Sequence, residues 1–319
     1  MRLNAPNAQS ICIFFVATLL LSACSTNKLD RSKKPEPGKA PDVSFSDYEK
    51  FQLDNGLTVF VVEDEQSPKV TYSLEIDRDP IAQGEKAGYV SLAGDMIGTA
   101  TNNRSKDELN QEVDFIGATL SANPTGVNAS ALKKRKEKLL DLTADVIKNS
   151  TFTQDELEKK KKRLKSGIKG SEEDPGSIAS NVFKKLIYGQ DHPYADVSTV
   201  ESVDRVEMAD IKEYYNKYYR PNISYLAVVG NTSKEEIKPL LEKKLGDWQE
   251  EDVPDHDYDQ PKQLESPKVA VVNRPNASQS TVRIGHTVDL QLSDDDYASA
   301  QLTNTILGGG AFRLFENLR

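Results

Sequence analysis

The chain has 319 residues, with 41 Lys and Arg against 50 Asp and Glu, which gives a formal net charge of −9. This acidic balance argues against a nucleic-acid-binding protein, because phosphates require a basic surface. With 37% hydrophobic and 29% charged residues, the composition is that of a soluble globular protein. Both cysteines lie within the first 24 residues, which excludes a disulfide scaffold, and three histidines are too few for a histidine-rich metal centre.

The first segment predicts an export signal. The apolar run Ile11–Leu21 is shorter than the roughly 20 residues needed to cross a bilayer, so residues 1–23 are expected to be a signal peptide. Its end, Leu21-Ser22-Ala23-Cys24, resembles a bacterial lipobox, which implies lipid attachment at Cys24. The alternative is an ordinary signal peptide in which Cys24 is incidental. Ser25 at the next position implies, by resemblance to sorted lipoproteins, anchoring in the outer membrane facing the periplasm. Residues 24–44, rich in Lys and Pro, predict an extended tether.

The body from residue 45 shows strand and helix patterns in turn. Asn55-Gly56 lies between two β-rich runs and predicts a hairpin within Phe51–Val62. Further strands are predicted at 70–76 and 223–229. Apolar residues at three- and four-residue steps, together with capping signals, predict helices. These helices are expected at 85–97, from 105, and at 133–147, 153–169, 178–188, 208–219 and 234–245.

One predicted helix carries a dense basic run, Lys159–Lys162, which would suit an anionic partner. Glu156 and Glu158 precede Lys160 and Lys162 by four residues, a spacing that favours ion pairs along the helix surface. A solvated helix face is therefore the better interpretation.

A second domain is expected after an acidic, proline-containing linker at 249–267. Strands are predicted at 269–272 and 281–288 and a helix at 294–307, after which the chain stops in mid-pattern. Because the helices follow and flank strands without strict β-α-β alternation, the fold class is α+β, an antiparallel-rich sheet packed by helices. We expect a complete first domain at 45–248 and a truncated second domain at 268–319.

Several segments together resemble the M16 metallopeptidase family, which includes pitrilysin, insulinase and mitochondrial processing peptidase. The resemblance runs from about Phe51 to the last residue. It is carried by the order of the following segments: Leu53-Asp-Asn-Gly-Leu-Thr-Val, Ala87-Gly88 and Gly98-Thr99 in a segment that resembles the active-site helix (85–99), Asp191-His-Pro-Tyr194, Tyr218-Tyr-Arg-Pro-Asn222, Leu226-Ala-Val-Val-Gly230 and Gly308-Gly-Gly. The resemblance implies α/β roll domains of the family type.

The family's chemistry requires H-x-x-E-H on a helix, where two histidines bind zinc and the glutamate activates water. Ser91 and Asp95 stand at the histidine positions, and Gly94 stands at the position of the general base. The third ligand of active members would fall near Gly167, where no acidic residue occurs. The resemblance therefore implies that no catalytic residue, metal ligand or cofactor is present, and that the chain alone does not hydrolyse peptides. The three histidines are expected to be ordinary surface or core residues.

Some bacterial M16 members work as pairs of one zinc-bearing and one silent subunit. The resemblance implies that this chain is a silent, lipid-anchored subunit that pairs with an active zinc peptidase, closes the chamber and helps hold peptide, with zinc only in the partner. Arg319 matches an arginine that holds substrate; the alternative is a solvated helix residue. Two other functions stay open: a stand-alone peptide-binding or scaffold lipoprotein, and an autonomous zinc peptidase.

Overall fold

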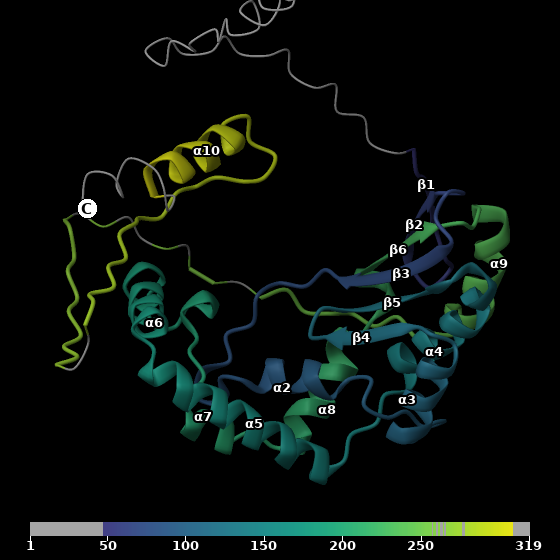
Figure 1. Cartoon of the computed structure of the whole chain (residues 1–319), viewed down its shortest axis with the longest axis horizontal. Coiled ribbons are helices and arrows are strands. Elements are labelled where there is room, and N and C mark those ends of the chain that lie inside the picture. Colours follow the sequence, from purple (N-terminus) through teal and green to yellow (C-terminus); the bar gives the residue numbers. More distant parts are fainter. Residues whose placement is uncertain are drawn as a thin grey trace, which may run out of the picture. The chain divides into compact units, whose positions relative to one another are not determined.

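The computed structural model describes residues 47–308 except 257, 260, 262–263, 265 and 276–277. In this part of the chain, strands and helices follow one another as drawn in Figure 1. The strands are β1 (Glu49–Gln52), β2 (Thr58–Glu63), β3 (Lys69–Ile76), β4 (Thr119–Asn123), β5 (Gly126–Leu132) and β6 (Ser224–Gly230). The helices are α2 (Tyr89–Met96), α3 (Lys106–Phe115), α4 (Lys136–Asn149), α5 (Gln154–Glu173), α6 (Pro175–Tyr188), α7 (Val200–Asp204), α8 (Met208–Tyr218), α9 (Lys234–Leu245) and α10 (Tyr297–Gly308).

The six strands form one mixed sheet in the order β1-β2-β6-β3-β5-β4. Every neighbouring pair is antiparallel except β2 and β6, which run parallel. The β1–β2 hairpin turns at Asn55-Gly56, as predicted, and Gly56 has φ +86°, a conformation that side-chain-bearing residues rarely adopt. The predicted α+β class with an antiparallel-rich sheet is confirmed.

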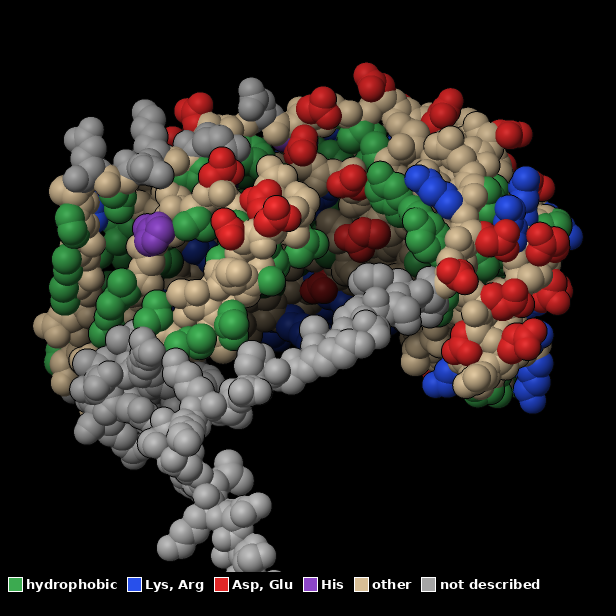
Figure 2. All heavy atoms as spheres, turned by 90° about the horizontal axis from the view of Figure 1, so that it is seen from above, with side chains coloured by type: hydrophobic (Ala, Val, Ile, Leu, Met, Phe, Trp, Pro, Cys, Tyr) green, Lys and Arg blue, Asp and Glu red, His purple; other side chains and the backbone are tan. Residues whose placement is uncertain are grey.

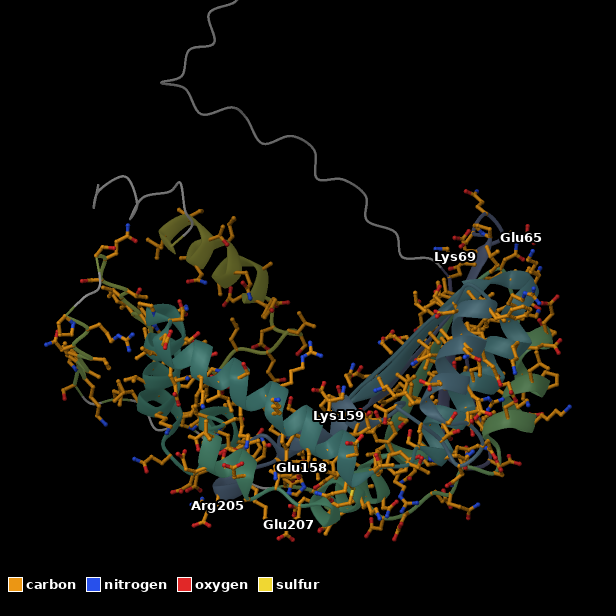
Figure 3. All side chains as sticks on the ribbon, turned by 60° about the horizontal axis from the view of Figure 1, so that its bottom comes forward. Glu65, Lys69, Glu158, Lys159, Arg205 and Glu207 are labelled. Carbon is orange, nitrogen blue, oxygen red and sulfur yellow. The ribbon has the colours of Figure 1, made fainter. Side chains whose placement is uncertain are left out.

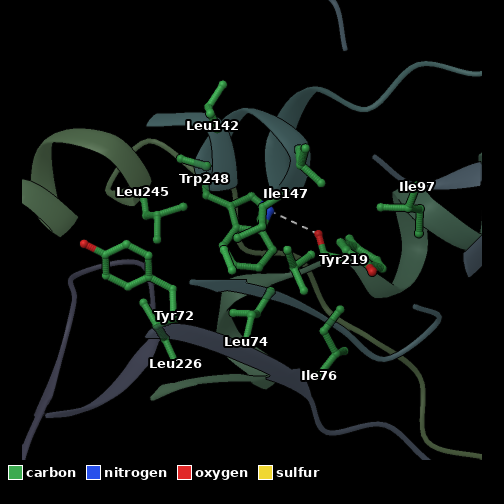
Figure 4. Packing of buried hydrophobic residues seen from close by; sticks show 14 of the residues in the cluster. Tyr72, Leu74, Ile76, Ile97, Leu142, Ile147, Tyr219, Leu226, Leu245 and Trp248 are labelled. Carbon is green, nitrogen blue, oxygen red and sulfur yellow. Dashed lines mark hydrogen bonds between the residues drawn. The ribbon is translucent and has the colours of Figure 1, made fainter. Parts of the chain in front are cut away.

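The core lies between one face of the sheet and helices α4 and α9 (Figures 1 and 4). Side chains of β3 alternate between buried and exposed, so that Tyr72 and Leu74 point into this core. Leu142 of α4 belongs to the same cluster of buried hydrophobic residues, on the helix side of Trp248 in Figure 4. The single tryptophan, Trp248, follows α9, and its indole N–H donates to the Tyr219 carbonyl at 3.1 Å. The chain after α9 is thereby fixed to the end of α8.

Asp145 of α4 is a buried carboxylate that fixes the loop following α2. Its oxygens accept hydrogen bonds from the Thr101 hydroxyl at 2.7 Å and the Asn149 amide at 2.8 Å. The Asn103 amide and the Arg104 guanidinium also donate to it. Although burial opposes its charge, these hydrogen bonds hold the pKa of Asp145 below its usual range. The three donors from residues 101–104 tie this loop to α4, whereas Asn149 belongs to α4 itself.

Helix α5 begins after Thr153, whose hydroxyl accepts the Glu156 N–H, so the predicted helix start is confirmed. Lys159 lies on the outer surface of this helix beside Glu158 (Figure 3). It is 63% exposed and pairs with Asp155 at 2.6 Å and with Glu156 at 3.5 Å. The predicted solvated face is therefore present at Lys159 and Lys162, which are exposed. Lys161 of the same run is buried, so the prediction does not hold for that residue.

After Trp248 the described residues contain no helix or strand until α10. The predicted strands at 269–272 and 281–288 are therefore wrong for the described residues, where Val269 is 87% and Ile284 is 91% exposed. A β-rich segment needs a neighbouring strand to pair its backbone groups, and none of the described strands pairs with these segments. The helix predicted at 294–307 is present as α10.

Charge on the molecular surface is mixed. On the face shown in Figure 2, acidic side chains lie among hydrophobic, polar and basic ones. Among the described residues, no helix combines the length and the apolar character that a bilayer crossing requires.

Candidate functional site

Helix α2 carries Ser91, Gly94 and Asp95, the three positions at which the sequence predicts replaced zinc ligands and a replaced general base. It begins after Gly88, which has φ +108° and packs close to Val203 of α7. The Gln83 side-chain oxygen accepts the Gly88 N–H at 3.0 Å and the Val90 N–H at 3.2 Å, which satisfies donors at the start of the helix. Leu92 is buried in the core, while α5 and α8 pack against the helix. The fold therefore holds this helix in a fixed place.

The three predicted positions on α2 have different environments. Ser91 and Asp95 are exposed and lie four residues apart, so both belong to one solvent-facing side of the helix. Gly94 is buried. A Cβ atom at position 94 would lie 2.3 Å from Cδ of Pro124 and 2.4 Å from its backbone nitrogen, far closer than carbon atoms approach in proteins. The position of a general base is thus occupied by another part of the chain.

Gly167, the predicted third position, lies in α5, the helix that packs beside α2. It is exposed, and no heavy atom outside its own helix lies within 4 Å of where its Cβ would be. The structure thus places all four positions on two neighbouring helices. A hydroxyl, two glycines and one carboxylate form a poor donor set for zinc, which prefers imidazole or thiolate.

The three histidines lie apart from α2 in separate surroundings. His192 is buried, its Nδ1 accepts the Tyr194 N–H at 3.1 Å, and burial lowers its pKa. His256 lies 2.5 Å from the Tyr218 hydroxyl, and His286 is exposed. Among the residues that the structure describes, no group of three or more His, Cys, Asp or Glu side chains is arranged to hold a metal ion.

The turn between β4 and β5 is the part of the site that sequence reasoning missed. The Tyr214 hydroxyl donates to the Pro124 carbonyl at 2.7 Å. The Tyr219 hydroxyl lies 2.6 Å from the Asn123 carbonyl and 3.2 Å from that of Gly126. Burial raises the pKa of both tyrosines, so their hydroxyls stay protonated and able to donate. Asn-Pro-Thr-Gly between two alternating runs is a turn signal that would have located this hairpin.

Strand β4 is an edge strand of the sheet and packs against α2. On its outer side, no described strand pairs with it. Thr119, Ser121 and Asn123 are exposed along it, and such a free edge can pair with an extended peptide through backbone hydrogen bonds. The predicted lipid-attachment residue Cys24 and the predicted substrate-holding residue Arg319 both lie outside the described residues.

Two family models match the chain. Residues 58–191 match the insulinase family of M16 peptidases, and residues 205–319 match the peptidase M16 inactive domain. The two matches follow one another and together span most of the chain.

The chain is also similar to known proteins over part of their length. Subunit 1 of the mitochondrial cytochrome b-c1 complex of Mus musculus is 28% identical over 217 residues, covering 63% of this chain and 44% of that protein. An uncharacterized zinc protease of Bacillus subtilis is 26% identical over 233 residues, covering 70% of this chain and 55% of that protein. The chain thus spans about half or less of the length of these relatives.

The crystal structure of the peptidase M16 inactive domain from Pseudomonas fluorescens has the same fold, with a TM-score of 0.69 and 23% sequence identity. The match covers 86% of this chain and 68% of that one. With these matches, the chain belongs to the M16 peptidase family and carries an M16 inactive-type domain.

Proposed function

We propose that this protein is a catalytically silent M16 subunit that pairs with an active zinc peptidase, closes the peptide chamber and helps hold the substrate. One observation carries the proposal: α2 keeps its place in the fold, while Ser91, Gly94 and Asp95 stand where ligands and base are needed. Water activation by zinc requires those groups. A domain that keeps the frame without them contributes through binding.

A role as a subunit agrees with the similarity to a relative that is named as one. Subunit 1 of the cytochrome b-c1 complex is, by its name, part of a larger assembly. Pairing with a zinc-bearing M16 chain would place zinc only in the partner. This chain would then bind the peptide and orient it, which lowers the activation barrier for hydrolysis at the zinc of the partner.

Peptide holding would use the free edge of the sheet. An extended peptide added to β4 would lie next to α2, because this edge strand packs against that helix. Backbone hydrogen bonds would hold it without strong preference for sequence, which suits a chamber that accepts varied peptides. Arg319 would add a guanidinium that donates to peptide carbonyls.

Anchoring would keep the pair in the bacterial envelope. Lipid on Cys24 and the extended tether at 24–44 would attach the protein to the outer membrane on its periplasmic side. Several acyl chains give stable attachment, since each buried methylene contributes about 0.8 kcal/mol.

The test is isolation of the tagged full chain from detergent-solubilised envelopes, followed by identification of M16 chains that co-elute. We expect one H-x-x-E-H-bearing partner, one zinc per pair, and loss of peptide hydrolysis by that partner when this chain is deleted. Labelling with radioactive palmitate should mark the wild-type chain and not Cys24→Ser.

Each alternative gives a different result. If the chain elutes alone and its amides at 119–123 exchange more slowly when peptide is added, it is a stand-alone binding protein. The pairing proposal would then be wrong. Equimolar zinc in the isolated chain, with hydrolysis that a chelator removes, would make it an autonomous peptidase.

A further inference from the structure

The β4–β5 turn packs so closely against α2 that it limits which residues the helix can carry at position 94. Of the three predicted positions on α2, Gly94 is the buried one, and a Cβ there would lie 2.3 Å from the ring of Pro124 and 2.4 Å from its backbone nitrogen. Any residue other than glycine must push the turn away. We propose that Asn123–Gly126 is a plug that closes the general-base position, so that restoring the helix residues alone cannot rebuild a catalytic site.

The plug is held from α8 and from β3. From α8, the buried hydroxyl of Tyr214 donates to the Pro124 carbonyl at 2.7 Å. From β3, the Ile76 N–H donates to the Thr125 carbonyl at 2.7 Å. Moving the turn would break both hydrogen bonds. The Ile76 N–H and the Tyr214 proton would lose their acceptors, although the Tyr214 oxygen would keep the Arg78 guanidinium as a donor, and this loss is costly.

The far end of the turn is equally confined. A Cβ at Gly126 would lie 2.0 Å from the Leu74 carbonyl oxygen, so the backbone of β5 lies directly against that of β3 at this point. Tyr219 adds a hydroxyl within 2.6 Å of the Asn123 carbonyl at the near end. The turn therefore has little freedom to shift away from α2.

The ligand positions differ from the base position. Ser91 and Asp95 are exposed, one helical turn apart, so side chains of larger size can extend into solvent there. Two histidines at these positions would share one helix face, the arrangement that binds zinc. The structure thus predicts that the metal-binding side of α2 is open while the base position is closed.

The first experiment compares two glycine-to-alanine variants of the full chain. Gly94→Ala and Gly167→Ala both replace a helical glycine, which by itself favours the helix. A Cβ at position 167 would meet no heavy atom outside its own helix within 4 Å, so the Tm of Gly167→Ala should equal that of the wild-type chain or rise slightly. Gly94→Ala should lower Tm by roughly 3 to 10 °C through overpacking. Equal changes in Tm for the two variants would contradict the proposal that the turn closes position 94.

Replacing Pro124 tests the identity of the plug. Pro124→Gly removes the ring and gives the turn more backbone freedom. In that background, Gly94→Ala should lower Tm by less than half as much as it does in the wild-type chain. Additive effects of the two substitutions would show that Pro124 does not close position 94.

Zinc binding separates the open positions from the closed one. The S91H/D95H variant should keep its Tm within a few degrees and bind one zinc ion in calorimetry. Adding Gly94→Glu should lower Tm well below that of the double variant, and adding Pro124→Gly should recover at least half of the loss. A triple variant as stable as the double variant, with Pro124 in place, would refute the proposal. These measurements need no partner and no peptide, so failure of the pairing proposal would be seen separately.

Discussion

Replacing Asp145 by asparagine should destabilise the domain strongly, because its carboxylate accepts four hydrogen bonds while only 4% exposed. An asparagine keeps one acceptor oxygen and turns an amide toward donors. Removing one partner of a buried ion pair costs about 3–5 kcal/mol. Arg104 retains Glu112 and Asp141 as partners, so we expect the lower end, about 3 kcal/mol.

For a domain of this size, that loss corresponds to a Tm decrease of roughly 6 to 12 °C. The assay is thermal and urea unfolding followed by the fluorescence of Trp248, the single tryptophan, which is buried in the core. The control is Asp155→Asn, whose carboxylate is 75% exposed and pairs with an exposed lysine, and which should change Tm by no more than about 2 °C. If both variants unfold alike, the Asp145 cluster does not fix the 101–104 loop and the reasoning is wrong.

The remaining predictions concern pH, a buried lysine and metal content. The pKa values of Asp141 and Asp145 are below their usual range: burial opposes the charge, but hydrogen bonds and nearby cations outweigh it. Their stabilisation is therefore complete above about pH 4 and lost as pH falls through the lowered pKa values, and D145N should show a shallower acid decline in Tm. The buried ammonium of Lys161 donates to the backbone carbonyls of Asp204, the last residue of α7, and Val206, at 3.1 and 2.9 Å. Lys161→Met should therefore cost about 1.5–3 kcal/mol in urea unfolding, whereas the exposed control Lys162→Met should have little effect. Elemental analysis of the isolated full chain should find no stoichiometric zinc; an equimolar amount removed by chelator would contradict the silent-subunit hypothesis.

Local signals in the sequence located most elements of the first domain. Asn55-Gly56 predicted the hairpin, and Gly56 adopts the positive φ that glycine allows in the connection between these strands. Ser105 predicted a helix start, and in the structure its hydroxyl and the Glu108 side chain form the reciprocal capping pair. These features depend on residues within one turn of each other, so the sequence is sufficient to find them.

Non-local pairing was harder to predict. The runs at 269–272 and 281–288 are β-rich, yet the described structure assigns no strand to them, because strand formation depends on a partner. Conversely, the short β4–β5 hairpin went unnoticed although its turn is marked by Asn123-Pro124. A strand of about five residues carries a weak signal until its neighbours are known.

For the candidate site too, some properties follow from the sequence and others only from the folded structure. The sequence by itself determined which side chains Ser91, Gly94 and Asp95 carry, and from these the family resemblance predicts that the ligands and the base are replaced. Only the tertiary structure decided that Pro124 occupies the space that a side chain at position 94 would need, while Ser91 and Asp95 are exposed to solvent. The physical reason is that van der Waals exclusion acts between atoms brought together by folding, and residues 94 and 124 become neighbours only when β4, β5 and α8 are in place.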